Sequence, residues 1–530
     1  MPGVSSFRST LSRAAPGAPT GLLAAFTALA VAELVAGLVR PAAGPVTVVG
    51  GAVIDRTPAA VKDFAIRTFG ENDKAVLRLG ILAILALIAV ALGVLALSHR
   101  RVGAAGVLLF GGVGSASALG RPDSTGLGDA LPSLVGAAAG AVALYLLASK
   151  AVPSPVPAGV DGETGAYGWN RRGFLTAAGV TAAAATSAGA LGRFLTSRRD
   201  QGAVASREAL VLPSPASPAP AAPEGTRLKV PGITAFSTPS RDFYRVDTAL
   251  TVPRIDAGTW RLRIHGKEVT RPRTYTLDQL LARPLIERDI TLTCVSNEVG
   301  GPYVGNARWL GVPLAELLRE AGVTPPSGGG KADQLVARSV DGMTLGSPVE
   351  DVMDGRDAML AVGMNGQPLP FDHGFPVRML VPGLYGYVSA CKWITDIELT
   401  TFDAYDPYWV KRTWARKAPI KTQSRIDTPK PFARPAAGTV IVAGVAWAQR
   451  RGITRVEIRM DDGPWQDADL AAQAGVDTWR QWSHRWNATP GGHTITVRAT
   501  DGTGQVQTEQ RARTVPDGAS GWHSVFVTAT

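Results

Sequence analysis

Long apolar runs near the N-terminus restrict the possible folds of this chain more than any other feature of the sequence. Four of them are each long enough to cross a bilayer as one helix, because about 20 apolar residues span its hydrocarbon core. A fifth run is weakly hydrophobic and rich in Ala, Gly, Val and Thr. The five runs are residues 21–39, 80–97, 103–119, 131–149 and 173–191. The sequence therefore predicts five transmembrane helices within residues 1–195.

Basic residues beside these runs predict the orientation of the helices, since Lys and Arg collect in cytoplasmic loops. They precede the first run, separate the second from the third, and precede the fifth. These residues are Arg8, Arg13, His99, Arg100, Arg101, Lys150, Arg171 and Arg172. We therefore expect a multi-pass protein of the cell membrane with a cytoplasmic N-terminus. Residues 40–74, 121–129 and everything after residue 195 are expected on the extracytoplasmic side.

Residues 170–175 read NRRGFL and resemble the twin-arginine export motif ahead of a weakly hydrophobic segment. An ordinary cytoplasmic flank would also carry two arginines. The Phe-Leu pair and the low hydrophobicity favour the export signal, which serves domains that fold before they cross a membrane.

Glu33 interrupts the first apolar run. A carboxylate inside a span is a candidate for a proton path, or it packs against another helix, and both interpretations stay open. A b-type haem is disfavoured, because His99 is the only histidine in this region.

Composition divides the rest of the chain into three parts. Residues 196–226 are rich in Pro, Ala and Ser, so we expect an extended tether. Residues 227–425 mix strand and helix patterns and form the predicted catalytic domain. Residues 426–530 carry short β-runs and turn signals, as in an all-β sandwich. The net charge of +11 comes from scattered basic residues, so it does not indicate nucleic-acid binding.

One of only two cysteines follows a predicted strand. The segment 291–301 reads TLTCVSNEVGG, in which β-branched residues lead to Cys294 and then to a turn with Gly300 and Gly301. A thiolate in this place suits a soft metal ligand or a nucleophile. A disulfide between Cys294 and Cys391 is a further alternative in an oxidising compartment.

Three segments resemble the sulfite oxidase family. Cys294 to Asn297 resembles its C-x-x-N loop, whose cysteine ligates molybdenum in a pterin cofactor. Residues 364–378 are close to a family fingerprint: they read MNGQPLP, then Phe371, then DHGFPVR. Residues 382–393 follow at the family's spacing, and the resemblance covers roughly residues 240–530.

The resemblance implies one molybdenum–molybdopterin per chain, with Cys294 as the metal ligand and catalytic centre. It implies that Arg245 holds a substrate oxygen near the metal. The residues implied in cofactor binding are Asn297, His373, Arg378 and Lys392. It also implies an α+β molybdopterin domain and an immunoglobulin-like sandwich of the dimerisation type.

Structural alternatives exist for the cofactor residues. Arg378 lies in an alternating pattern and would suit a solvated strand face. Lys392 would suit a sheet edge, and the segment around His373 a simple turn. Their joint order along the chain favours the cofactor role.

Departures from the family pattern concern the cofactor and the substrate. Val246 and Asp247 replace an Asn-His pair, so one cofactor contact is missing or is supplied otherwise. In the substrate pocket, Glu298 follows the metal loop where sulfite-oxidising members carry arginine. Leu345 stands near the place of a family tyrosine. These changes weaken a dianion pocket and make a neutral sulfoxide a plausible substrate.

The sequence therefore predicts a membrane-anchored oxidoreductase that transfers an oxygen atom at a Cys-ligated molybdenum, on a small sulfur-containing substrate such as sulfite. A sulfoxide reductase is the alternative enzyme. A non-catalytic, membrane-tethered binding scaffold is the alternative from another class. The predicted partners are the substrate, a separate cytochrome or quinone electron carrier, the membrane and a second copy of the chain.

Overall fold

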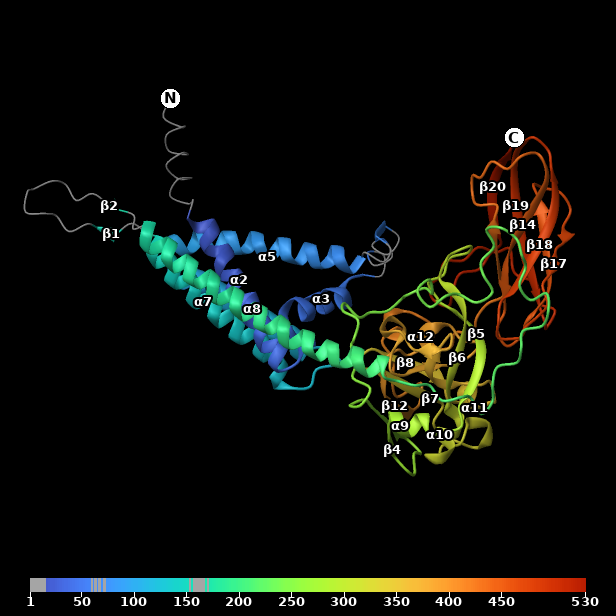
Figure 1. The fold of residues 1–530 in the computed structure, drawn as a ribbon, viewed down its shortest axis with the longest axis horizontal. Coiled ribbons are helices and arrows are strands. Elements are labelled where there is room, and N and C mark those ends of the chain that lie inside the picture. Colours follow the sequence, from blue (N-terminus) through green and yellow to red (C-terminus); the bar gives the residue numbers. More distant parts are fainter. Residues whose placement is uncertain are drawn as a thin grey trace, which may run out of the picture. The chain divides into compact units, whose positions relative to one another are not determined.

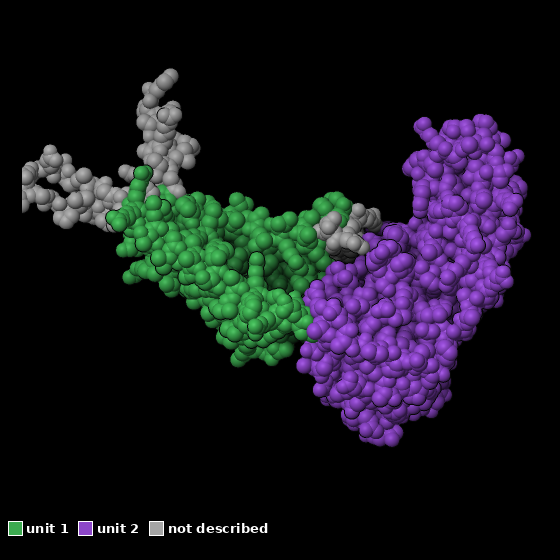
Figure 2. Space-filling view, viewed as in Figure 1, with its two compact units in different colours: residues 1–202, 248–251 green, residues 203–247, 252–530 purple. Residues whose placement is uncertain are grey.

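The computed structural model describes residues 16–58, 73–151 and 171–530, with a few short stretches between them. The chain divides into two compact units: residues 1–202 with 248–251, and residues 203–247 with 252–530 (Figure 2). Two residues of the predicted basic flanks, Arg8 and Arg13, lie outside the described residues, and so does Asn170 of the twin-arginine-like motif.

Long helices make up the first unit (Figure 1). They are α2 Gly17–Leu38, α3 Pro45–Arg56, α5 Asp73–Ser98, α6 Arg100–Leu119, α7 Leu131–Ala151 and α8 Arg171–Glu208. Among the described residues, five helices are long and apolar enough to cross a membrane, and these exclude α3. The helices coincide with the five predicted runs, while the side on which each loop lies stays a prediction.

Small residues let these helices approach closely, as is usual in membrane bundles. A Cβ at Gly140 of α7 would lie 2.9 Å from the carbonyl oxygen of Ala24 in α2. A Cβ at Gly192 of α8 would lie 2.8 Å from the carbonyl oxygen of Glu33. Glu33 therefore lies where α8 crosses α2, on a packed helix face.

A charged cluster joins two of the loops between these helices. Arg40 donates to both carboxylate oxygens of Asp129, at 2.9 and 2.6 Å, and to Asp123 at 2.9 Å. The loops that contain these residues therefore meet at one end of the bundle. Their common position agrees with the prediction that both loops lie on the same side.

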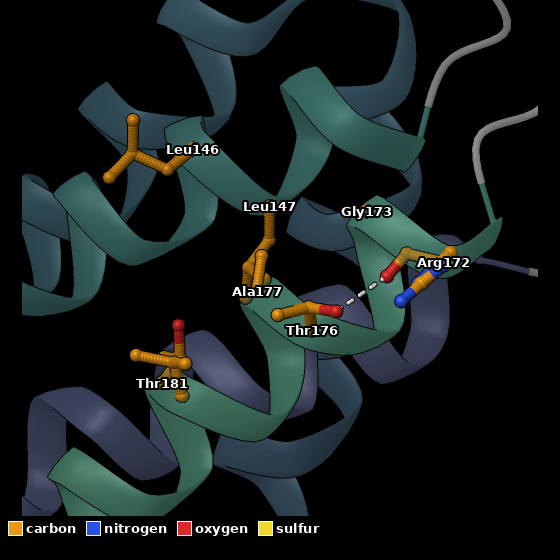
Figure 3. A pocket seen from close by; sticks show the side chains of 8 residues that line it. Leu146, Leu147, Arg172, Gly173, Thr176, Ala177 and Thr181 are labelled. Carbon is orange, nitrogen blue, oxygen red and sulfur yellow. Dashed lines mark hydrogen bonds between the residues drawn. The ribbon is translucent and has the colours of Figure 1, made fainter.

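A pocket of about 610 Å³ lies between the end of α7 and the start of α8 (Figure 3). Leu146 and Leu147 line it from α7, and Arg172 and Thr176 from α8. The hydroxyl of Thr176 donates to the carbonyl of Arg172 at 2.8 Å. The second arginine of the twin-arginine-like motif thus borders this pocket near the basic end of α7.

Two five-stranded sheets form the larger part of the second unit; the first is antiparallel, and the second is mixed because β3 and β12 pair in parallel. The first has the order β10-β9-β6-β5, with β11 also paired to β9, and the second has the order β4-β3-β12-β7-β8. The strands of the first sheet are β5 Ile286–Thr293, β6 Val304–Pro313, β9 Met359–Met364, β10 Gln367–Pro368 and β11 Arg378–Leu380. Those of the second are β3 Arg261–Gly266, β4 Arg273–Thr276, β7 Gln334–Ser339, β8 Thr344–Pro348 and β12 Ile394–Thr400. Short helices accompany them: α9 Leu277–Leu281, α10 Leu314–Glu320, α11 Val349–Met353 and α12 Gly386–Ser389.

Two four-stranded antiparallel sheets follow, with the orders β13-β14-β18-β17 and β16-β15-β19-β20. Their strands are β13 Gln423–Thr428, β14 Gly438–Trp447, β15 Ile453–Met460, β16 Gln466–Asp467, β17 Asp469–Leu470, β18 Arg480–Ala488, β19 Gly491–Asp501 and β20 His523–Ala529. The sequence pattern predicts strands at residues 439–445, 454–460, 494–499 and 505–509, and the first three lie within β14, β15 and β19. The fourth prediction is wrong, because only an isolated bridge of Val506 with Thr500 is found there.

The segment 196–226 differs from the expected tether. Its first part has no proline and continues α8 to Glu208. Near that end, Arg207 donates to the carbonyls of Leu369 and Pro368 at 2.7 and 2.8 Å. Farther on, Ser217 pairs with Ile286 of β5. Residues 207–217 therefore pack against the second unit and do not form an extended tether.

Candidate active site

The predicted metal loop connects β5 to β6. Cys294 follows β5, and its N–H donates to the carbonyl of Tyr303 at 2.9 Å, which closes the loop at its base. The N–H of Asn297 donates to the carbonyl of Cys294 at 3.0 Å. Gly300 has φ +79°, a conformation that glycine adopts without steric cost. The β-branched run and the glycine turn thus place the thiol at a fixed point.

The Cys294 thiol is buried, and both cysteines are free. The alternative of a disulfide between Cys294 and Cys391 is therefore wrong. Burial raises the pKa of the Cys294 thiol, while hydrogen bonds from Ser296 and the charge of Lys392 oppose that shift. A bound cation would favour the thiolate in this place.

Asn297 has its side chain at the same loop and is 2% exposed. Its Oδ1 accepts a hydrogen bond from the N–H of Tyr303 at 2.8 Å. Its Nδ2 has no hydrogen-bond partner among the described residues. A buried donor without a partner costs free energy, so this amide is available to a ligand.

The segment 364–378 packs against β6 and against residues 238–240. Asn365, at φ 52°, holds the hairpin of the MNG motif, because its Oδ1 accepts the N–H of Arg308 at 3.1 Å. His373 is buried, and its Nε2 lies 2.9 Å from the carbonyl oxygen of Ser240. Since a carbonyl can only accept, Nε2 carries the proton. Burial, and then the charges of Arg378 and Lys392, lower the pKa of His373 to about 4.

The pH dependence of stability should report this shift. In the unfolded chain the ordinary pKa of 6.5 returns, so unfolding takes up a proton between about pH 6.5 and 4, and stability falls as pH falls through that window. Between pH 7 and pH 4 the unfolding free energy should fall in both proteins. In His373→Gln we expect this fall to be about 3 kcal/mol smaller than in the wild type. Denaturant unfolding of the full chain in detergent at both pH values measures the difference.

A control with the opposite sign is present in the β-sandwich. Asp461 raises the pKa of His493, so the stability gained from that pair is present at low pH and is lost as pH rises through the folded pKa. His493→Gln should therefore steepen the loss of stability on acidification. Equal pH dependence in His373→Gln and the wild type would contradict the buried, neutral His373.

Arg378 is a buried cation, 5% exposed, on β11. It donates to the carbonyl of His373 at 3.2 Å and lies over the ring of Trp309 at 5.0 Å from the ring centre. Its Nε has no hydrogen-bond partner in the described part of the chain. Burial lowers the pKa of Arg378 to about 10. The alternative of a solvated strand face is therefore wrong.

Lys392 and Arg245 share one carboxylate. Lys392 Nζ lies 2.9 Å from Asp247 and donates to the carbonyl of Asp372 at 3.0 Å. Arg245 Nε donates to Asp247 at 3.1 Å, and its Nη1 lies 3.2 Å from the Asp372 carboxylate. The Lys392 side chain is 10% exposed, so it is not an ordinary edge lysine. A cluster of two cations and two anions thus borders the site.

The five predicted residues other than Cys294 are connected to its neighbourhood by contacts of different kinds. Asn297 shares the loop of Cys294, and its N–H donates to the carbonyl of Cys294. Lys392 acts electrostatically on both the Cys294 thiol and His373. Arg378 and Lys392 both lie against Gly374, because a Cβ added there would be 3.1 Å from the Cβ atom of each. Asp247 and Asp372 connect Arg245 to the cluster.

Tyr244 is a site residue that the sequence analysis did not assign. Burial and then the charge of Cys294 raise its pKa, so the phenol stays protonated at neutral pH, while Arg378 opposes the shift. It stacks on Phe243 at 5.2 Å between ring centres. The only signal in the sequence is its position next to Arg245.

The donors at this site fit a molybdenum–pterin group. A buried thiol suits a soft metal, and the unpartnered donors of Asn297 and Arg378 suit ring or phosphate acceptors. Lys392 and the neutral His373 add a cation and a polar ring beside them.

A family model for an oxidoreductase molybdopterin binding domain matches residues 249–409. The mitochondrial sulfite oxidase of Rattus norvegicus is 29% identical over 292 residues, 47% of this chain and 52% of that protein. That of Drosophila melanogaster is 30% identical over 300 residues, 47% of this chain and 50% of that protein. This chain thus spans about half the length of these relatives.

Two further proteins are similar to this chain, one over a smaller part of its length and one at a lower sequence identity. Nitrate reductase (NADH) 1 of Oryza sativa subsp. japonica is 33% identical over 200 residues, 33% of this chain and 21% of that protein. The structure of the sulfane dehydrogenase SoxCD of Paracoccus pantotrophus is 25% identical with a TM-score of 0.49, covering 56% of this chain and 82% of that one.

The matched segment contains Cys294, Asn297, His373, Arg378 and Lys392, while Arg245 precedes it. The sequence motifs and the relatives thus agree. Residues 249–409 match a molybdopterin-binding oxidoreductase domain, and the chain is similar to sulfite oxidases over about half of its length.

Proposed function

We propose that this chain is a membrane-anchored enzyme that holds one molybdenum–molybdopterin at Cys294 and transfers an oxygen atom to or from a small sulfur-containing substrate. One observation carries the proposal. A buried thiol lies beside two buried donors, Asn297 Nδ2 and Arg378 Nε, that have no partner within the described residues. In a scaffold that binds no cofactor, both unsatisfied buried donors would lower the stability of the fold without any compensating hydrogen bond.

Each residue has a proposed task. Cys294 would hold the metal, Arg378 and Lys392 would bind anionic or carbonyl groups of the pterin, and the bound group would supply two-electron oxygen-atom transfer. Asn297 would donate from Nδ2. Arg245, one-third exposed, would orient a substrate oxygen. Tyr244, protonated at neutral pH, would be a hydrogen-bond donor at the same place.

Metal and pterin content of the purified full-length protein tests this proposal. We expect about one molybdenum and one pterin per chain when the protein is produced with a full cofactor supply. Absence of both would contradict the proposal and leave the membrane-tethered scaffold as the better explanation.

Sulfite is the first candidate substrate, and a sulfoxide is the second. One observation favours the second. Asp247 and Asp372 neutralise Arg245 and Lys392, so the cluster offers little net charge to a dianion. Turnover of sulfite with an artificial electron acceptor, compared with turnover of a sulfoxide with a reduced dye, distinguishes them. A separate cytochrome or quinone carrier would exchange the electrons, and a second copy of the chain would bind through the β-sandwich.

The proposed location also has a direct test. Replacing Arg171 and Arg172 by Lys should leave the catalytic domain on the cytoplasmic side, because the twin-arginine pathway requires both guanidinium groups. Protease treatment of cells with a permeabilised envelope should then degrade the wild-type domain and spare the variant. Lys150→Arg is the matched control, since it changes a flanking cation outside the motif. Equal degradation of the double variant and the wild type would contradict the export signal.

A further inference from the structure

The C-terminal β-sandwich makes direct hydrogen bonds to the strand that ends at Cys294. Gln449, in the turn after β14, is fully buried. Its Nε2 donates to the carbonyl of Thr291 at 2.9 Å and lies 3.3 Å from the hydroxyl of Thr293. The N–H of Trp479 donates to the hydroxyl of Thr291 at 2.8 Å. The C-terminal end of β5 is thus hydrogen-bonded to two residues that lie more than 150 positions later in the sequence.

The same sandwich holds the turn that follows Cys294. Arg425, at the start of β13, donates to the carbonyl of Gly301 at 2.9 Å and is fixed by Asp427 at 2.7 Å. The ring of His523, at the start of β20, occupies the place where a Cβ on Gly300 would lie. His523 is itself fixed, because its Nδ1 accepts the N–H of Ile426 at 3.0 Å.

The hydrophobic core continues across this contact. Val445 and Trp447 of β14, with Trp479, belong to the same buried cluster as Leu292 of β5 and Val304 of β6. A second buried cluster within the sandwich contains Val442, Trp482, Ile495 and Val527, among others. One end of the sandwich is therefore built into the catalytic core, and its other end is not.

We propose that the β-sandwich positions the metal loop, with Gln449 and Arg425 as the positioning residues. The inference rests on the proposed function, which makes Cys294 the metal ligand. A ligand must be held within fractions of an ångström, and residues around it supply that rigidity. Gln449 fixes the strand before the thiol, and Arg425 with His523 fixes the turn after it.

Gln449→Leu in the full-length protein tests the inference. The change keeps the apolar volume and removes the bond to Thr291. We expect about tenfold faster amide hydrogen exchange in residues 291–303, because one buried hydrogen bond is lost. We also expect a changed electron paramagnetic resonance spectrum of Mo(V), with molybdenum content retained. Arg425→Met should act in the same way, and Arg425→Lys should restore the spectrum in part.

Glu457→Gln is the matched control. Glu457 is 4% exposed and pairs with Arg498 within the sandwich, away from β5. The control should leave both readouts unchanged. Unchanged exchange in Gln449→Leu and Arg425→Met, or equal changes in Glu457→Gln, would overturn the inference. A wild type without molybdenum would contradict the proposed function, while the exchange measurement would still decide whether the sandwich holds this loop.

Discussion

Replacing Cys294 by Ser should lower turnover on the order of a thousandfold or more, with the fold intact. A hydroxyl is a hard, weakly acidic donor and does not replace a thiolate on a soft metal. The thiol is buried against its own loop, where serine fits, so the unfolding free energy should change by about 1 kcal/mol at most. Turnover, molybdenum content and denaturant unfolding, measured on the same preparation, check both halves of the prediction.

Cys391→Ser is the natural control for this variant. Cys391 is the other buried thiol, 2% exposed, and lies next to Lys392. Burial raises its pKa strongly, which marks an inert thiol. The Cys391→Ser variant should therefore retain both its molybdenum and its activity. An active Cys294→Ser, or an equal loss in both variants, would contradict the assignment of Cys294 as the ligand.

The local parts of the site were predictable from sequence because they depend on neighbours along the chain. The β-branched run before Cys294 forms β5 as expected, and it pairs with β6, the next strand along the chain. Thr276 and Gln279 form the capping box that a Thr-Leu-Asp-Gln sequence predicts. Asn297 and His373 lie at the site because short motifs fix their positions.

Contacts between distant segments were not predictable in this way. Asp247 meets Lys392 across 145 positions, and Gln449 meets Thr291 across 158. No periodic pattern marks such pairs, because each side chain alone would suit a solvated surface. The strand β18 was missed for a related reason: its Trp, Arg and His residues show no clean alternation, and its burial comes from both sheets. Tertiary packing thus decides the electrostatics of this site.

Arg378→Met should remove the cofactor without weakening the fold, which is the second large effect we expect. No carboxylate pairs with Arg378 among the described residues, so its desolvation is poorly compensated. Methionine has a similar length and is apolar, and it would keep the contact with Trp309. Pterin content should fall at least tenfold, because a charge-assisted bond to the ligand is lost. The unfolding free energy without cofactor should stay equal or rise by about 1–2 kcal/mol.

Arg283→Met should give the opposite result. Arg283 makes a bidentate pair with Glu320 at 2.7 Å for both contacts, and its side chain is 23% exposed. Its loss should lower stability by about 1 kcal/mol and leave pterin content unchanged. The two variants therefore separate a cation kept for a ligand from one kept for the fold. Retention of pterin in Arg378→Met, or a fall in its stability well beyond that of Arg283→Met, would show that Arg378 serves the fold and not the cofactor.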